Sequence, residues 1–178
     1  MSRAPVQIMD AEEIRQAVAR LGGEIFDGLN VDDTVLVLGV QRGGMGMGRR
    51  LAGELSSLLG HPVPHGSIDG GMHRDDLDHR HDVHLHPTEI PVAVDDQIVI
   101  LADDVIASGR TVRAVLDELQ NHGRPRAVRL AVLIDRGHRE LPIQPDHVAR
   151  VVEAEDQDRV MVKWLEEHGE DAVHVVPA

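Results

Sequence analysis

The chain has 178 residues, a formal net charge of −13 and no cysteine. Its length suits one domain, residues 1–178, and the absence of cysteine excludes disulfides and favours a reducing cytoplasm. No apolar run is long enough to span a membrane, and one phenylalanine, one tryptophan and no tyrosine exclude base stacking on aromatic platforms.

The first half of the chain predicts a helix, a buried strand and a second helix. Asp10 is a predicted N-cap, because acids follow it and Ile14, Val18 and Leu21 then recur on one face. Residues 34–38 form an apolar run that is typical of a buried strand. After a glycine-rich turn, one buried helix face is indicated by Leu51, Leu55, Leu58 and Leu59.

The middle of the chain is less regular. Residues 62–68 look extended, whereas the polar, histidine-rich stretch of about 70–91 has neither a helical nor a strand period. We interpret 70–91 as a long flexible loop or hairpin, and a loop of that length in a compact domain usually has a function.

The second half predicts further alternation of strands and helices. Residues 98–102 form an apolar strand that ends at two acids, and a helix follows over 110–122. Residues 127–134 predict another buried strand, and 159–164 and 172–176 predict shorter, late strands. This alternation indicates an α/β fold with a mostly parallel central sheet flanked by helices.

A phosphate-binding turn is predicted where the strand at 98–102 leads into its helix. Gly109 lets the backbone approach a ligand closely, and Ser108 and Thr111 add hydroxyl donors. The helix N-terminus supplies N–H groups and positive potential. Asp103 and Asp104, just upstream, could hold sugar hydroxyls. The alternative is an ordinary helix start beside two solvated acids.

The first of two such turns in chain order, the glycine-rich Gly39–Gly44, also joins a buried strand to a helix. Such a turn can place backbone N–H groups against an anion. Its glycines do not follow the G-x-G-x-x-G spacing of a dinucleotide site, and no acid stands at the position that would contact a ribose. Together with the later turn, it could form the other half of one ligand site.

The run Val99–Thr111 resembles the motif with which type I phosphoribosyltransferases bind 5-phosphoribosyl-1-diphosphate (PRPP). The resemblance implies that Asp103 and Asp104 contact the ribose hydroxyls. It implies Mg²⁺ as cofactor, held mainly by the substrate and additionally by these two acids. The residues implied to cradle the 5′-phosphate are Ala107, Ser108, Gly109, Arg110 and Thr111.

Two further stretches, Met72–Leu77 and Leu130–Pro142, narrow the resemblance to the pyrimidine-operon regulator and uracil phosphoribosyltransferase family (PyrR). The family implies a type I phosphoribosyltransferase fold with a loop or hairpin hood, and a homo-oligomer, dimeric or higher. It implies conversion of uracil and PRPP to UMP and pyrophosphate. Many members also bind the leader RNA of pyrimidine genes.

The same resemblance implies roles for individual residues. Arg74 would close over the site, and Asp104 would assist acid–base chemistry, so these two are the candidate catalytic residues. Pyrophosphate would meet Arg74 and the turn residues Val40, Gln41, Arg42 and Gly43. Uracil would meet Asp135, Arg136 and Gly137. The alternatives are that 74–76 is a solvated turn with self-paired charges and that 135–137 is an ordinary tight turn after a strand.

The chain departs from the family pattern in three places. His73 stands where a tyrosine is usual, and Arg42 and Gly43 stand where threonine and arginine are usual. After Asp146, the acidic run 151–158 replaces a basic segment. This run and the net charge argue against RNA binding, although a local basic patch is available between Arg124 and Arg150.

Three functions are therefore kept open. The uracil phosphoribosyltransferase is preferred over a UMP-sensing RNA-binding attenuation regulator with little catalysis, and over a purine phosphoribosyltransferase. A histidine cluster in the loop could bind a transition metal, but its spacing fits no structural zinc pattern, which favours solvated residues. Its members are His79, His81, Asp82, His84 and His86.

Overall fold

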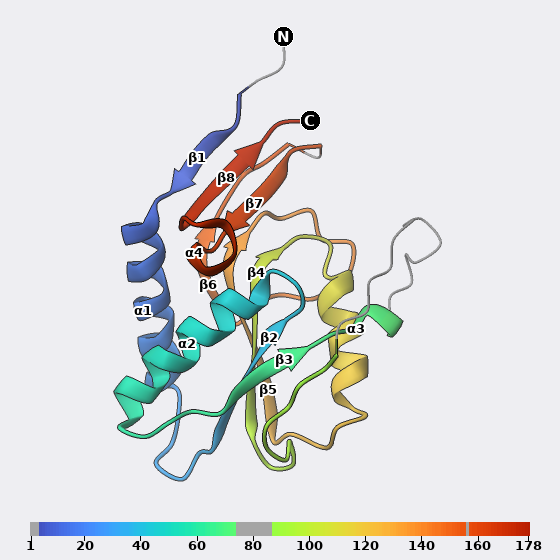
Figure 1. The fold of residues 1–178 in the computed structure, drawn as a ribbon. Helices are drawn as coiled ribbons and strands as arrows, with labels where there is room; N and C mark the ends of the chain where they lie inside the picture. Colours follow the sequence, from blue (N-terminus) through green and yellow to red (C-terminus); the bar gives the residue numbers. More distant parts are fainter. Residues whose placement is uncertain (1–3, 74–86, 156) are drawn as a thin grey trace.

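A computed structural model describes residues 4–73, 87–155 and 157–178. Its centre is a parallel five-stranded sheet in the order β3-β2-β4-β5-β6 (Figure 1). The strands are β2 (Val35–Val40), β3 (His65–Ile68), β4 (Ile98–Ile106), β5 (Ala127–Asp135) and β6 (His147–Val151). The predicted α/β class with a parallel sheet is confirmed.

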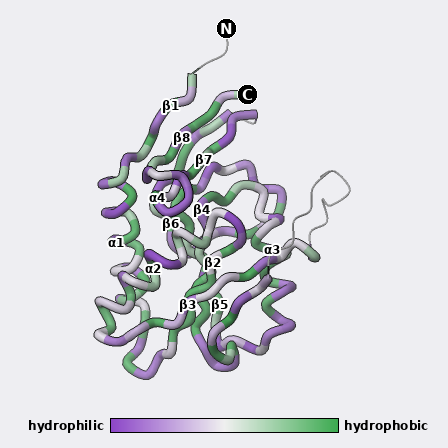
Figure 2. Tube along the Cα trace, viewed as in Figure 1, coloured by the Kyte–Doolittle hydropathy of each residue, from purple (hydrophilic) through white to green (hydrophobic). Residues whose placement is uncertain are grey.

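Helices cover both faces of this sheet. The helices α1 (Ala11–Asp27) and α2 (Gly44–Leu59) pack on one face, and α3 (Arg110–Leu119) packs on the other. Successive residues of a strand point to opposite faces, so Val37 contacts the first core and Leu38 the second. Figure 2 accordingly shows hydrophobic residues along the central strands. None of the described helices is long and apolar enough to cross a membrane.

A second, three-stranded antiparallel sheet brings the two ends of the chain together. Its order is β1-β8-β7, and in Figure 1 it stands above the carboxyl end of the parallel sheet. The late strands at 159–164 and 172–176 are confirmed as β7 (Arg159–Lys163) and β8 (Ala172–Val176), with the short α4 (Leu165–His168) between them. They belong to this separate sheet because β8 pairs with β1 (Val6–Met9), which the sequence analysis missed together with β6.

Most predicted boundaries agree with the structure, and two need correction. Asp10 forms a capping box with Glu13, as its sequence position indicated. The strand predicted at 98–102 continues to Ile106, because its backbone goes on pairing with β5 beyond the acids. The helix predicted at 110–122 ends at Leu119, where the N–H of His122 bonds to the Leu119 carbonyl in a tighter turn.

The segment 70–91 is described only at its two ends. Gly71–His73 form one 3₁₀ turn, and Glu89 pairs with Ser67 in an isolated antiparallel bridge. Residues 74–86 lie outside the described part of the chain.

The start of α2 lies so close to the parallel sheet that side chains would not fit. A Cβ on Gly44 would lie 2.3 Å from the carbonyl oxygen of Ala102, and one on Gly48 would lie 3.0 Å from Gly39 Cα. The glycine-rich sequence therefore brings the backbone of α2 directly onto β2 and β4, which fixes the turn before it.

Gly44→Ala should destabilise the protein by about 1–3 kcal/mol, because the new methyl group meets a backbone atom that cannot move aside. Gly53→Ala is the matched control in the same helix, since a Cβ there meets nothing within 4 Å. The control should be neutral or stabilising by up to about 1 kcal/mol. Chemical denaturation measures both, and equal stabilities of the two variants would contradict the close packing.

Candidate functional site

Two adjacent acids lie near the carboxyl end of the central strand β4. Asp103 is 6% exposed and its Oδ1 accepts the N–H of Asp104 at 2.9 Å. The Oδ1 of Asp104, which points to the opposite face of the sheet, accepts the N–H of Val105 at 2.8 Å. Burial and the neighbouring Asp104 charge raise the pKa of Asp103 well above its ordinary value, and burial raises the pKa of Asp104.

The first glycine-rich turn rests against this acid pair. A Cβ on Gly43 would lie 1.9 Å from Asp104 Oδ2, and a Cβ on Gly44 would lie 3.0 Å from Asp103 Cα. Only glycine at position 43 leaves the Asp104 carboxylate in place. The structure therefore brings together the predicted turn and the predicted acids, which are 60 positions apart in the sequence.

Neighbouring strands hold the rest of this turn. Val40 is the last residue of β2, and the N–H of Gln41 donates to the Ile68 carbonyl at 3.0 Å. The Gln41 side chain donates to Ser67 Oγ at 3.2 Å, and the Gln41–Arg42 peptide bond is cis. Arg42 is exposed, so its guanidinium can reach an anion in solution.

The second turn, 107–111, follows β4 directly and leads into α3. Gly109 has φ +89°, a conformation that favours glycine. The N–H of Arg110 donates to Ser108 Oγ at 3.3 Å, while the Ser108 carbonyl accepts the N–H of Glu140 at 3.0 Å. Thr111 lies in the first turn of α3, whose N-terminus has positive potential. The turn is thus supported from behind by the segment around 140.

The predicted base segment, 135–137, is built around an internal ion pair. Asp135 Oδ2 accepts a bond from Arg139 at 2.6 Å, and Asp135 Oδ1 accepts the N–H of Gly137 at 2.9 Å. Arg139 also donates to the Ala107 carbonyl at 2.9 Å. Burial alone would raise the pKa of Asp135, but Arg139 and the Gly137 N–H hold that pKa below its usual value.

This ion pair ties the base segment to the second turn. Because its carboxylate is occupied by Arg139 and the Gly137 N–H, Asp135 shapes the segment. The Arg136 N–H donates to the Ile106 carbonyl at 3.1 Å and the Gly137 carbonyl accepts a bond from Arg139 at 3.3 Å, so these backbone groups belong to the same internal network. Arg139 was not among the predicted site residues, although its spacing of four from Asp135 was a readable signal.

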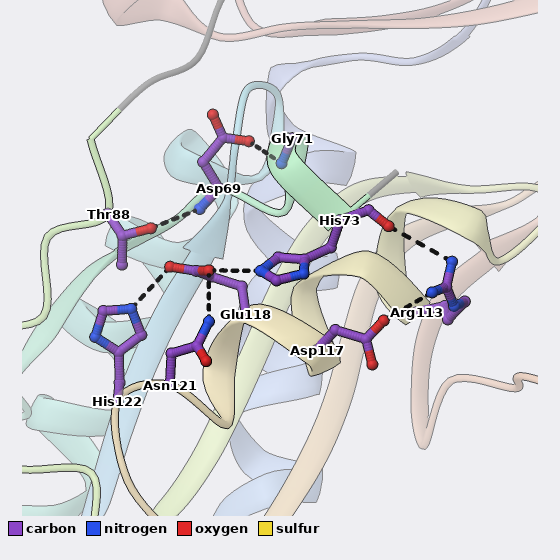
Figure 3. A network of polar contacts seen from close by, with 9 residues as sticks. All are labelled: Asp69, Gly71, His73, Thr88, Arg113, Asp117, Glu118, Asn121 and His122. Carbon is purple, nitrogen blue, oxygen red and sulfur yellow. Dashed lines mark hydrogen bonds and ion pairs between the residues drawn. The ribbon is translucent and has the colours of Figure 1, made fainter. Parts of the chain in front are cut away.

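A polar network joins the described start of the 70–91 segment to α3 (Figure 3). Glu118 accepts bonds at 2.9 Å from the imidazoles of His73 and His122, one on each carboxylate oxygen. Its Oε2 also interacts with the Asn121 amide at 3.2 Å. Gly70 packs on α3, where a Cβ would lie 2.7 Å from the backbone of Val115. His73, at the position where the family usually has tyrosine, therefore helps to hold the start of the 70–91 segment against α3.

Several predicted residues cannot be placed. Arg74 lies outside the described residues, as does the histidine-rich group His79, His81, Asp82, His84 and His86. Within the described part of the chain, no three His, Asp or Glu side chains are grouped so that they alone could hold a metal ion.

Comparisons with known proteins agree with one another. The family model described as "Phosphoribosyl transferase domain" matches residues 6–166. A protein named "Bifunctional protein PyrR" from Pelotomaculum thermopropionicum is 41% identical over 177 residues, which cover 99% of this chain and 98% of that protein. A protein of the same name from Streptomyces coelicolor is 42% identical, over 93% of this chain and 86% of its own length.

Solved structures resemble the fold as well. A hypoxanthine-guanine phosphoribosyltransferase from Bacillus anthracis has a TM-score of 0.74 at 17% identity, and 99% of each chain is covered. A hypoxanthine phosphoribosyltransferase from Trypanosoma cruzi has a TM-score of 0.71 at 18% identity, with 98% and 97% covered. At these identities the likeness shows the fold alone.

Asp103→Asn should stabilise the ligand-free protein at pH 7 by about 1–2 kcal/mol, since each pKa unit is worth about 1.4 kcal/mol. The pKa of Asp103 is raised in the folded protein, so wild type has its full stability only when this carboxyl is protonated, below the ordinary pKa of 3.8. That stability is lost as the pH rises. The gain should therefore vanish near pH 3. Thermal unfolding at both pH values measures it, with the exposed Asp32→Asn as control. A variant less stable than wild type at pH 7 would contradict the burial argument.

Glu118→Gln should lower the melting temperature by a few degrees at pH 7. Burial raises the Glu118 pKa, but bonds from His122, His73 and Asn121 outweigh it and hold the pKa below 4.5. Stability from a lowered pKa is present above the ordinary value and is lost as pH falls, so the two proteins should converge near pH 3. The exposed Glu153→Gln is the control, and a pH-independent difference would sink the electrostatic explanation.

Proposed function

Given that this chain belongs to the phosphoribosyltransferase family, and within it to the PyrR proteins, we propose that it transfers the phosphoribosyl group of PRPP to uracil, forming UMP and pyrophosphate. The observation that carries the proposal is the close packing of Gly43 against the Asp104 carboxylate. It puts a turn suited to pyrophosphate, two acids suited to ribose and a turn suited to a phosphate at the carboxyl end of one parallel sheet, where α/β folds bind ligands.

Each part of PRPP has a proposed partner. The turn 107–111 receives the 5′-phosphate through backbone N–H groups, the Ser108 and Thr111 hydroxyls and the N-terminus of α3. Asp103 and Asp104 hold the ribose hydroxyls. The turn Val40–Gly43 receives pyrophosphate, with the exposed Arg42 as its cation and Arg74 as a second one.

The base is proposed to lie beside the end of β5. Uracil presents N–H and carbonyl groups along one edge. The backbone of 136–137 carries groups of both kinds, which are bonded within the chain in this structure and would have to exchange those bonds for the base. Asp135 and Arg139 hold this backbone in place. Base choice then depends on main-chain positions that the ion pair fixes.

The proposed chemistry needs positioning more than a nucleophile. The bond from the anomeric carbon to pyrophosphate breaks, positive charge develops on the sugar, and the uracil nitrogen attacks the same carbon while its proton passes to Asp104. The two carboxylates beside the sugar, Asp103 buried and Asp104 half-buried, stabilise that positive charge, and the first turn stabilises the departing pyrophosphate. Asp104 is the proposed acid–base group, because burial raises its pKa toward the range useful for proton exchange.

The residues present fit Mg²⁺. Burial destabilises the charged forms of Asp103 and Asp104, and the Asp104 charge further destabilises that of Asp103; a divalent cation would relieve both effects. The described residues offer no complete cage of protein ligands, which suits an ion held mainly by phosphates and water. Asp103 and Asp104 would hold Mg²⁺, which would supply charge neutralisation to the pyrophosphate.

Regulation of pyrimidine genes is the second proposed role, carried by the name "Bifunctional protein PyrR" of the relatives. Arginines of the expected basic patch, however, are engaged within the chain. The pairs are Arg126 with Asp33, Arg129 with the Gly28 carbonyl, Arg139 with Asp135, and Arg150 with Glu13. Together with the net charge of −13, these pairings favour the enzymatic role over RNA binding. We further propose a single-domain, cytoplasmic homo-oligomer.

The first test is pyrophosphate release from PRPP and Mg²⁺, with uracil, hypoxanthine, guanine and orotate offered separately. We expect release with uracil alone. Asp104→Asn should lower kcat/KM by about 100-fold or more, because general acid–base groups usually contribute that much. The exposed Asp32→Asn serves as the control and should leave the rate unchanged.

The other outcomes of this assay are equally informative. Turnover with a purine would move the base assignment and keep the reaction class. A protein that binds UMP or PRPP but turns over none of the bases would overturn the enzyme proposal in favour of the regulator.

A further inference from the structure

Trp164, the sole tryptophan of the chain, touches the first glycine-rich turn from the other sheet. It is 1% exposed and stands between β7 and α4. Its indole N–H donates to the Gly43 carbonyl at 2.9 Å. Its ring also fills the space beside Gly46, where a Cβ would lie 2.6 Å from the indole.

Gly43 is consequently held from two sides. Its carbonyl accepts the indole N–H, and its Cα faces the Asp104 carboxylate with no room for a side chain. The carbonyl and N–H of a trans peptide point in opposite directions. The bond to Trp164 therefore fixes the plane of the 43–44 peptide and directs its N–H, at the start of α2, away from the indole.

A second contact locks the indole in place. The Arg50 guanidinium, from α2, lies 4.6 Å from the centroid of the Trp164 rings. Arg50 is itself held by Asp171 at 2.8 Å and Glu166 at 2.9 Å, both in the segment 165–171 that follows Trp164. The Asp171 carboxylate also accepts the N–H of Leu165 at 2.8 Å. Trp164 thus contacts the start of α2, and Arg50 of α2 in turn binds the segment that follows Trp164.

We propose that Trp164 is a positioning residue for pyrophosphate: it holds the turn at Gly43 so that the backbone N–H groups and Arg42 face the anion. The proposal rests on the proposed function in taking pyrophosphate as the ligand of this turn. A hydrogen bond to a carbonyl also polarises its peptide, which makes the N–H of that peptide a better donor to an anion. Trp164 acts through the turn and does not touch the substrate.

The decisive variant is Trp164→Phe, which keeps an aromatic ring over Gly46 and removes the indole N–H. With Mg²⁺ present, we expect calorimetry to show pyrophosphate binding weakened about tenfold. The KM for PRPP should rise by a similar factor while the KM for uracil stays unchanged. Val162→Ala, a buried neighbour on β7, is the structural control and should lower the melting temperature without weakening pyrophosphate binding.

Fluorescence of the wild-type protein gives a second readout that needs no variant. Because the chain has one tryptophan and no tyrosine, its emission reports on Trp164 alone. Titration with pyrophosphate and Mg²⁺ should shift this emission with the dissociation constant that calorimetry gives, and uracil alone should not.

The outcomes separate this inference from the proposed function. Pyrophosphate affinity of Trp164→Phe within twofold of wild type, or an emission unchanged at saturation, would overturn the positioning role while leaving the enzyme intact. Failure of the wild-type protein to bind pyrophosphate or PRPP at all would overturn the proposed function, and this inference with it.

Discussion

The burial of two adjacent carboxylates in the central strand is the constraint on which the rest of the structure depends. Asp103 and Asp104 lose much of their hydration, so both have raised pKa values, and the Asp104 charge raises that of Asp103 further. The first turn accommodates the Asp104 carboxylate because Gly43 has no side chain and leaves that space to it. A ligand that brings hydroxyl donors and a cation would relieve the cost of this burial, which supports the proposal that the acid pair holds the ribose of PRPP.

Both turns of the site present backbone to the ligand, and both are held from behind by side chains. Arg139 connects the Asp135 carboxylate to the carbonyl of Ala107, and Trp164 connects the small sheet to the carbonyl of Gly43. The side chains that give the site its shape are therefore different from those that meet the substrate. This division suits a reaction in which placement of two reactants and charge stabilisation supply the catalysis.

Arginines on the surface also form contacts within the chain. Arginines outside the site are used to tie loops and helices to acids and carbonyls of the same chain, as Arg150 does with Glu13 and Arg20 with the Ala149 carbonyl. Exposed pairs of this kind contribute little stability each, but each one places an acid or a carbonyl of the same chain beside the arginine. With the net charge of −13, these pairings disfavour binding of a polyanion on this surface.

The sequence by itself determined the parallel α/β class, the helix capped by Asp10, the two glycine-rich turns and the acid pair. These features depend on local patterns: alternation of apolar runs, capping residues, and glycine where the backbone must turn or approach closely. The family resemblance added PRPP as the ligand that these features are expected to bind together.

Only the tertiary structure decided which distant segments meet. Strand β1 has no recognisable pattern of its own and exists because β8, more than 160 positions later, pairs with it. Whether Asp135 binds a ligand or Arg139, and whether Trp164 is a core residue or a support for Gly43, depends on contacts between separate elements. Such contacts are set by how the two sheets and their helices pack together, which no local stretch of sequence specifies.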